Sequence, residues 1–571
     1  MAAPLRRVTP TAPAAPTFER FTTGAARAAA VVVYVLPLAL AVLLALAEGL
    51  QAAGWQALRD DPQTGPALRA SLVTALASTA CALALTLLLV TALHASRWWP
   101  RVVAALAPML AVPHAAFAIG VAWLVAPAGW FARVLAPLAG WDAPPDWQTV
   151  NDPAGLALTG VLVLKELPFL LWNAAAMLAR PEAAALLRRE IAVARSLGYP
   201  STSWWWRVGW RQWLPRLAWP VLAVLAYALT VVDLALLVGP GAPPTLAVLA
   251  WQGLADGNAG RNAQGAATAV LLTAVLAAII GAGWLLHRLA QPAWSRAATG
   301  GRRPVAPATS SAIAPPRTAR LLVAAVASVY IAAAVSLAVL SVAGPWRFPL
   351  PLPPETSVLA WAAVGSAAEV MGTSLLLATM GSAAALVLVV GWLEATPPSW
   401  DRTVAPWVLA PLVLPQLLWL VGLYRGALVL RLDGTLAGLA WAHVIVVLPY
   451  VYTALAPAWR SFDPRYEWTA RALGRGRWAF RWRVKWPLLA APIASALAIG
   501  FAVAVAQYLV TQFIGAGRHA TLTTEAVTLA SGGQRNVAAA WALLQALLPL
   551  AAFALARWVG RAGAARGAAT G

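Results

Sequence analysis

The sequence predicts an all-α, polytopic membrane protein of about twelve transmembrane helices, arranged as two parallel six-helix repeats. Three observations lead to this prediction: the composition, the number of long apolar stretches, and a loop motif that occurs twice. Of the 571 residues, 61% are hydrophobic and only 11% are charged, whereas about 25% charged residues is usual in a soluble domain. The mean hydropathy is +0.72. The composition therefore indicates a chain that lies largely in lipid.

The apolar stretches set the number of predicted spans, because a helix needs about 20 apolar residues to cross a bilayer. Twelve stretches are long enough, and they lie at roughly 28–47, 70–93, 102–126, 155–178, 217–239, 265–287, 320–343, 366–393, 404–424, 436–456, 488–511 and 537–556.

The basic residues predict the orientation. With the N-terminus in the cytoplasm, the inner segments hold 31 of the 41 Lys and Arg residues, the outer segments hold 9, and Lys165 lies within a span. Cytoplasmic loops of membrane proteins carry such an excess of Lys and Arg. We therefore expect a multi-pass protein of the bacterial cytoplasmic (inner) membrane, surrounded by lipid, with both termini in the cytoplasm. The net charge of +21 is then a sign of topology, and we expect no binding to nucleic acid.

The spans also predict the domain organisation. We expect a cytoplasmic tail at 1–27, a first half at 28–287, a cytoplasmic linker at 288–319 and a second half at 320–571. The linker is basic and rich in residues that break regular structure. Each half holds an even number of spans, so both halves enter the membrane from the same side and the repeat is parallel.

A polar loop between the fourth and fifth span of each half contains the same string, Ala-Arg-x-Leu-Gly. The two copies lie 276 residues apart, and this offset also aligns Gly239 with Gly515 further along the chain. A register kept through an intervening apolar span indicates an internal duplication. The residues expected to form the two loops are Glu190, Ala194, Arg195, Leu197 and Gly198 in the first copy and Glu467, Ala470, Arg471, Leu473 and Gly474 in the second.

Each loop predicts a short helix, a glycine turn and a second short helix that leads into the next span. Aromatic and basic residues follow the glycine, and tryptophan there suits the headgroup layer of a membrane. A single such loop is equally well explained as a surface helix. Two loops in equivalent places favour a pair of docking points for a partner with two-fold symmetry.

The loop resembles the cytoplasmic loop of permease subunits of binding-protein-dependent ABC importers. The pattern of that family is Glu-Ala-Ala, three residues, Gly, nine residues, then Ile-x-Leu-Pro. The second copy matches the glycine at Gly474 and places Pro487 thirteen residues later. Neither copy has Glu in the position of the pattern, where Ala192 and Trp468 stand instead. A salt bridge from a glutamate at this position of the pattern is therefore not supported for either copy.

The fused arrangement of two halves resembles the iron(III) and thiamine branch of these importers. Residues 232–247 and 515–527 are most similar to an uncharacterised thiamine-type fused permease. The resemblance implies a permease subunit that forms the translocation pathway for a small solute. It further implies a separate ABC ATPase, acting as a dimer on the two loops, and a periplasmic or lipoprotein solute-binding protein at the outer mouth.

Hydrolysis of ATP is expected on another subunit, not on this chain. A phosphate-binding loop needs Gly-x-x-x-x-Gly-Lys-Ser/Thr, and the only lysines, Lys165 and Lys485, lie in no such motif. We expect no catalytic residues, no metal site and no cofactor. An ion-coupled secondary transporter remains the alternative, and a membrane enzyme such as a lipid-linked transferase is a third possibility without an obvious catalytic cluster.

Ionisable and polar groups within the spans are candidates for the translocation path, because such groups are costly in lipid. The candidates are Asp233, Gln507, Lys165 and Glu166. Lys165 and Glu166 are adjacent, so they do not face each other on a helix, and each needs another partner. Interhelical contacts that stabilise the bundle are the alternative role for this pair. His443 has no second ligand at helical spacing, which favours a hydrogen-bonded histidine over a metal ligand.

Overall fold

The structure, a computed structural model, describes residues 17–299 and 317–569. Residues 1–16 of the predicted tail and 300–316 of the predicted linker lie outside the described residues. The described part is helical throughout apart from loops and one isolated bridge between Ala343 and Thr356. This confirms the predicted all-α class.

The helices of the first half precede residue 300. They are α1 (Thr17–Ala30), η1 (Val31–Val35), α2 (Leu36–Gly49), α3 (Ala52–Asp60), α4 (Thr64–Leu93), α5 (Trp99–Ala111), α6 (His114–Val125), α7 (Trp130–Ala139), α8 (Leu156–Leu178), α9 (Pro181–Ser196), α10 (Ser201–Trp204), η2 (Trp205–Gly209), α11 (Trp210–Trp213), η3 (Leu214–Leu217), α12 (Ala218–Thr230), α13 (Asp233–Val238), α14 (Leu246–Ala255) and α15 (Ala259–Thr299).

The helices of the second half follow residue 316. They are α16 (Arg317–Ser341), α17 (Leu359–Ser366), α18 (Ala368–Ala395), η4 (Pro398–Trp400), α19 (Asp401–Val413), α20 (Gln416–Val429), α21 (Leu436–Arg460), α22 (Arg465–Ala472), α23 (Arg477–Phe480), η5 (Arg481–Lys485), α24 (Trp486–Leu488), α25 (Ala490–Val505), α26 (Leu509–Ile514), α27 (Leu522–Ser531) and α28 (Arg535–Ala569).

The number of membrane-crossing helices agrees with the sequence prediction of about twelve. In the described residues, ten helices are long and apolar enough to cross a membrane, and the number rises to twelve if two bent pairs each count as one span. Helix α15 continues to Thr299, so it includes the first part of the segment predicted as a linker.

The third span of each half is broken, which the apolar stretches alone do not reveal. In the first half, α5 ends at Ala111 and α6 begins after Pro113. In the second half, α19 and α20 meet at Pro415 with a bend of 99°. Proline lacks an N–H group and forces the residue before it into an extended conformation. The prediction of continuous spans at 102–126 and 404–424 is therefore wrong, because each stretch forms two helices and not one.

The fifth span of each half also ends earlier than predicted. Helix α12 stops at Thr230, and the last part of the predicted span 217–239 is the separate short helix α13. In the second half, α25 stops at Val505 and α26 follows it in the same way.

Four pairs of elements in the two halves have the same bounds after a shift of 276 residues. The pairs are α10 with α23, η2 with η5, α13 with α26, and α14 with α27. Both α14 and α27 begin at a capping threonine, and both have their first backbone N–H bound by a serine hydroxyl, Ser71 for Leu246 and Ser374 for Leu522. The local structure of the two halves is thus alike in detail.

Each half contributes its first helix to the other half. Helix α2 packs along α20, and α16 packs along α6. Glycine allows the close approach in both places: a Cβ on Gly422 would lie 1.7 Å from the carbonyl oxygen of Ala41, and one on Gly120 would lie 2.8 Å from that of Ala333. Small residues let helix backbones approach in a membrane.

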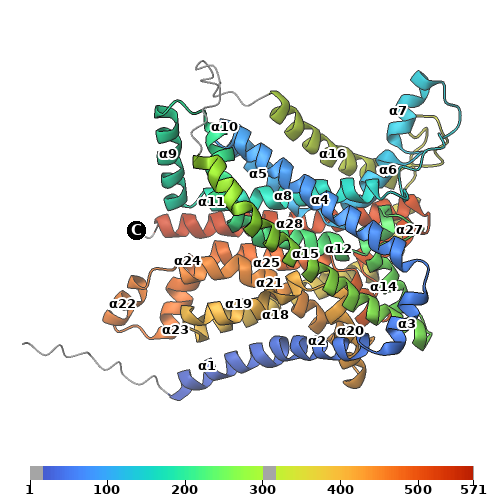
Figure 1. Cartoon of the computed structure of the whole chain (residues 1–571). Coiled ribbons are helices and arrows are strands. Elements are labelled where there is room, and N and C mark those ends of the chain that lie inside the picture. Colours follow the sequence, from blue (N-terminus) through green and yellow to red (C-terminus); the bar gives the residue numbers. More distant parts are fainter. Residues whose placement is uncertain (1–16, 300–316, 570–571) are drawn as a thin grey trace, which may run out of the picture.

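The two ends of the helical bundle carry different elements (Figure 1). Helices α9 and α22, which belong to the two loops, lie at one end together with the C-terminal end of the chain. Helices α3, α7 and α27 lie at the opposite end. Both loops therefore project from the same end of the bundle.

Candidate functional site

The backbone of the two loops has the same turn. Gly198 and Gly474 have positive φ angles of 82° and 70°. In the first copy, the N–H of Gly198 donates to the carbonyl of Arg195 at 2.9 Å, and the N–H of Tyr199 donates to that of Ala194 at 2.8 Å. This pattern is the Schellman motif, which ends a helix with a left-handed residue.

The second copy repeats these hydrogen bonds. The N–H of Gly474 donates to the carbonyl of Arg471, and the N–H of Arg475 donates to that of Ala470, both at 2.9 Å. The shared Ala-Arg-x-Leu-Gly string thus specifies a helix stop. Its alanine and arginine supply the accepting carbonyls, and its glycine takes the φ angle that other residues avoid.

The side chains at the tips of the loops are open to solvent. Leu197 and Leu473, which precede the two glycines, are 60% and 72% exposed. A leucine exposed at a tip in both loops is available to a partner. The first helix differs in length between the copies, because α9 begins at Pro181 whereas α22 begins at Arg465.

The charged side chains of the loops make mainly local contacts. Arg195 donates to the hydroxyl of Ser201 at 2.8 Å, and Arg471 forms an ion pair with Glu467 one turn earlier. Glu190 accepts from the amide of Gln212 at 3.3 Å. None of these contacts fixes a loop to the rest of the bundle over a long distance.

Tryptophan rings anchor the first loop inside the protein. Four of them, Trp204, Trp205, Trp210 and Trp213, are at most 5% exposed. The ring of Trp205 lies 4.8 Å from that of Trp210 and 5.8 Å from that of His94. Burial lowers the pKa of His94 below its usual value, because an apolar environment disfavours the charged form. These four rings therefore pack inside the protein, whereas Trp206, in the same stretch of sequence, is 52% exposed.

Ion pairs anchor the second loop instead. The carboxylate of Glu394, at the end of α18, accepts from Arg481 at 3.0 Å and from Lys485 at 2.9 Å. These three side chains are only 15–17% exposed. Arg460 forms a two-pronged pair with Asp401 nearby, at 2.8 and 2.9 Å. The two loops therefore share a backbone shape but are held by different chemistry.

Lys165 caps the broken third span of the first half. Its ammonium donates to the backbone carbonyls of Met109 at 3.1 Å and Val112 at 2.7 Å. These carbonyls lie at the end of α5, where the break leaves them without helical partners. The side chain is turned to these carbonyls and only 2% of Lys165 is exposed, so the geometry favours the structural alternative for this residue.

Glu166 has a different partner from Lys165. Its carboxylate lies 3.7 Å from Nε2 of His114, which follows the break in the third span. The ring of His114 lies 4.9 Å from that of Tyr227. Asp233 at the start of α13 lies within electrostatic range of His114 and of Tyr508 in the second half.

Two amide side chains of the second half pair with each other. Gln416, the first residue of α20, donates to Gln507 at 3.4 Å. Gln507 is only half-buried. Of the four predicted path residues, Glu166 and Asp233 thus lie within electrostatic range of Tyr450 and Tyr508 of the second half. Gln507 directly precedes Tyr508. Lys165 is bound to the end of α5, and its ammonium lies 5.6 Å from the ring of Tyr330 of the second half.

His443 lies within the second half. It is 1% exposed, and its Nε2 shares a hydrogen bond of 3.2 Å with the hydroxyl of Thr511. In the described part of the chain, no group of three or more His, Cys, Asp and Glu side chains could hold a metal ion.

No family model matches this sequence. The chain is 36% identical over 545 residues to the inner membrane ABC transporter permease protein YnjC of Escherichia coli (strain K12), and the alignment covers 93% of this chain and 96% of that protein. The chain belongs to the ABC transporter permease family. Membership of this family is what the two loops and the helical bundle led us to expect.

Several polar residues of this permease were missed by the sequence interpretation. His114 and Gln416 contact Glu166 and Gln507, and Tyr508 lies within electrostatic range of Asp233, but none of the three was predicted. A signal was present, because His114 and Gln416 each directly follow the proline that breaks a third span. A polar residue after a proline within an apolar stretch marks a backbone break that faces the protein interior.

Proposed function

We propose that this chain is the transmembrane subunit of an ABC importer in which both permease halves are fused. It forms the pathway for a small solute delivered by a solute-binding protein, and a separate ATPase dimer moves it through the two loops. We place it in the cytoplasmic membrane with both termini and both loops in the cytoplasm. The domain limits are those given above, and the two halves descend from one duplicated unit.

One observation carries this proposal: two loops with the same Schellman turn project from the same end of the bundle with an exposed leucine at each tip. A partner can change the conformation of a protein only through contacts that differ between two states. The two loops offer such contacts at related positions in both halves. A two-fold partner could therefore act on the halves together.

The pathway is assigned to the contact between the halves. Glu166 and Asp233 come from the first half and lie within electrostatic range of Tyr450 and Tyr508 of the second half. Gln507 comes from the second half and directly precedes Tyr508. Ionisable groups at membrane depth usually face a protein interior or a water-filled cavity. Lys165 is assigned to the scaffold because it caps α5.

The solute class rests on sequence resemblance. Residues 232–247 and 515–527 support the iron(III) and thiamine branch, with thiamine-type fused permeases the most similar. In this arrangement the binding protein sets the selectivity, so a binding assay on that protein identifies the solute.

An ion-coupled secondary transporter gains no support from these observations. Such a carrier would be expected to place carboxylates in both halves, yet the residue that matches Asp233 after a shift of 276 is Leu509. Both residues begin the corresponding short helices, α13 and α26. Membership of the ABC permease family also weighs against this alternative.

The first experiment tests the side on which the loops lie. In a background with Cys81 replaced by serine, Ser196→Cys and Ala472→Cys place single thiols at the exposed ends of α9 and α22. We expect no labelling of either by a membrane-impermeant maleimide in spheroplasts and equal labelling after permeabilisation. Asp142→Cys, at the opposite end, is the control and should label in both conditions. Labelling of only one loop in spheroplasts would place the loops on opposite faces and end the proposal.

The second experiment tests the coupling to an ATPase. Proline at Gly198 and Gly474 cannot adopt the positive φ angle and removes the N–H that donates to Arg195 and Arg471. Asparagine at the same positions tolerates this conformation and serves as the matched control. We expect an ABC ATPase subunit to co-purify with the wild type and the asparagine variant but not with the proline variant. An unchanged complex in all three would contradict the role of the loops.

A further inference from the structure

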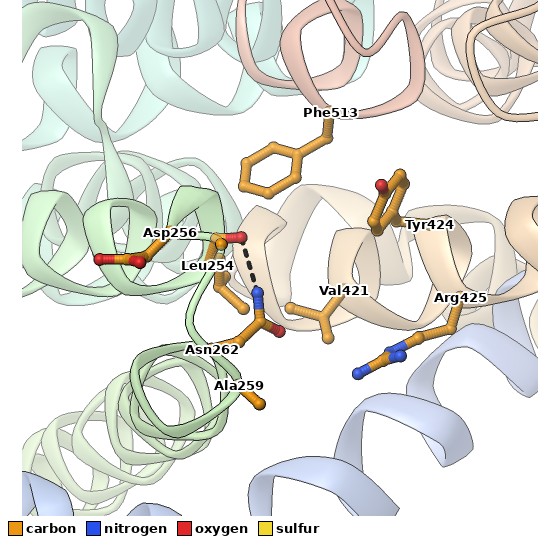
Figure 2. A pocket seen from close by; sticks show the side chains of 9 residues that line it. Leu254, Asp256, Ala259, Asn262, Val421, Tyr424, Arg425 and Phe513 are labelled. Carbon is orange, nitrogen blue, oxygen red and sulfur yellow. Dashed lines mark hydrogen bonds between the residues drawn. The ribbon is translucent and has the colours of Figure 1, made fainter.

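Some arginines of the bundle are neutralised inside the protein and others are not. Figure 2 shows Arg425 beside a cavity of about 210 Å³, and its guanidinium is paired with Glu48. At the second loop, the carboxylate of Glu394 neutralises two cations. Near the first loop, Arg211 and Arg288 take part in no ion pair found within residues 17–299 and 317–569. Their charge is therefore open to an anion from outside the chain.

One face of the last part of α15 carries this open charge. Trp284, Arg288 and Ser295 follow one another at intervals of four and seven residues, so they lie on one side of the helix. The guanidinium of Arg288 lies over the ring of Trp284, with Cζ 4.2 Å from the ring centroid. Both side chains are exposed. This face therefore presents a cation and an aromatic ring together.

The first loop contacts the same face of α15. Nη2 of Arg211, the second residue of α11, donates to the hydroxyl of Ser295 at 3.4 Å, and α15 packs against η2 and α12. Ser295 follows Arg288 by about 10 Å along the helix, at 1.5 Å per residue. Glu190 binds Gln212, the neighbour of Arg211, but pairs with neither arginine. Two arginines from different elements thus border one stretch of surface.

This surface lies at the level of the lipid headgroups. Arg211 and Arg288 lie just outside the predicted spans 217–239 and 265–287. Figure 1 shows the C-terminal part of α15 reaching the end of the bundle that carries α9 and α10. Tryptophan is enriched at the boundary between lipid and water, and Trp284 is 55% exposed. The anions that surround the protein at this level are the phosphates of lipids.

The second half does not repeat this surface. After a shift of 276 residues, the three matching positions hold neither a charge nor an aromatic ring. They are Gly560 for Trp284, Ala564 for Arg288 and Pro487 for Arg211. The carboxylate of Glu394 holds the second loop in place of an external anion. An anion is therefore needed beside the first loop alone.

We propose that the headgroup of an anionic phospholipid binds between Arg211 of the first loop and Arg288 of α15. Its phosphate supplies the negative charge that Glu394 supplies at the second loop. Trp284, one turn closer to the middle of the membrane, contacts the start of the acyl chains. The bound lipid joins the first loop to α15, so the mobility of this loop depends on the charge of the membrane. This inference goes beyond the proposed function, because lipid binding requires neither an ATPase nor a solute-binding protein.

The first test is native mass spectrometry of the full-length protein titrated with phosphatidylglycerol. We expect Arg211→Gln and Arg288→Gln each to weaken binding of the first lipid by about fivefold, because each basic residue adds to the attraction of an anionic lipid. The double variant should lose less than the product of the two single losses, because residues that bind one headgroup are coupled. Independent losses would mean two separate sites and would overturn the inference.

Arg557→Gln is the matched control. Arg557 is exposed on α28 beside the exposed Trp558, and α28 occupies in the second half the place of α15 in the first. The position that matches Arg211 there is Pro487, so no second arginine of that kind completes a site. We expect this variant to bind phosphatidylglycerol as the wild type does. Phosphatidylcholine, which has no net charge, should bind equally to all variants.

The second test measures amide hydrogen exchange of the protein in lipid nanodiscs. Exchange in residues 201–213 should be slower in phosphatidylglycerol than in phosphatidylcholine, because the bound headgroup holds the loop to α15. This difference should disappear in Arg288→Gln. Exchange in residues 477–488 should not respond to the lipid, because Glu394 holds the second loop in both membranes. An equal response of both loops would contradict a site that is specific to the first half.

Three other outcomes would overturn the inference. Equal weakening by Arg557→Gln and Arg288→Gln would mean that the lipid follows the overall charge of the surface. Displacement of phosphatidylglycerol by an equal concentration of inorganic phosphate would make the surface a small-anion site. Unchanged lipid binding in Arg211→Gln and Arg288→Gln, together with loss of a co-purifying ATPase, would assign the arginines to a protein partner. Neither lipid assay needs an ATPase, so its failure is distinct from a failure of the coupling experiment.

Discussion

Substitution of Gly422 by alanine tests the packing contact between α2 of the first half and α20 of the second half. The new Cβ would lie 1.7 Å from the carbonyl oxygen of Ala41, and Cβ atoms are essentially never found closer than 3.0 Å to another heavy atom. The atoms of α2 nearest to it, O, C and Cα of Ala41, are all backbone. No side chain can rotate to make room, so α2 and α20 must move apart.

The size of the effect follows from this displacement. A gap of 0.5–1 Å already removes about a quarter to a half of the dispersion energy of each contact, and overpacking typically costs about 1–3 kcal/mol. We therefore expect Gly422→Ala to lower the free energy of unfolding by about 3 kcal/mol. Gly120→Ala, where the distance is 2.8 Å, should cost less.

Gly426 provides the control on the same helix. It lies one turn after Gly422, and a Cβ there would meet no atom within 4 Å. Alanine favours a helix by about 1 kcal/mol over glycine, so Gly426→Ala should be neutral or stabilising. Denaturant titration of the purified protein in mixed micelles measures all three variants. If Gly422→Ala is no more destabilising than Gly426→Ala, the described contact between α2 and α20 is incorrect.

Three further predictions concern the loops. Trp205→Ala should cost about 3 kcal/mol in thermal unfolding because it empties a buried site, whereas Trp206→Ala, next to it but 52% exposed, should change stability by less than about 0.5 kcal/mol; equal effects would contradict the burial of the first loop. Glu394→Gln leaves two largely buried cations without a carboxylate, so amide hydrogen exchange should rise in residues 477–488 but not in 201–213. Gly198→Ala should lower the stability of the turn by about 1–2 kcal/mol through its positive φ angle alone, since no atom obstructs the Cβ. Hydrogen exchange of the Tyr199 amide should therefore be faster in the variant. An unchanged exchange rate would refute this prediction.

Much of the fold could be read from local sequence. The length of the apolar stretches predicted about twelve spans, because crossing lipid requires a helix that satisfies its own backbone. The string Ala-Arg-x-Leu-Gly predicted a helix that stops at glycine, because the Schellman turn needs a residue that tolerates positive φ. Both are local requirements, so the sequence determines them without knowledge of distant neighbours.

The tertiary structure decided the partners of the polar groups. Sequence placed Lys165 beside Glu166 but gave no means to know that one caps α5 while the other faces His114. It also gave the two loops the same aromatic and basic character, yet only the fold buries Trp205 and brings Glu394 to the second loop. These contacts join residues far apart in the chain, and their geometry depends on how helices of both halves pack together. For this protein the sequence determined the helices and their turns, and three-dimensional proximity determined which charges and rings hold them.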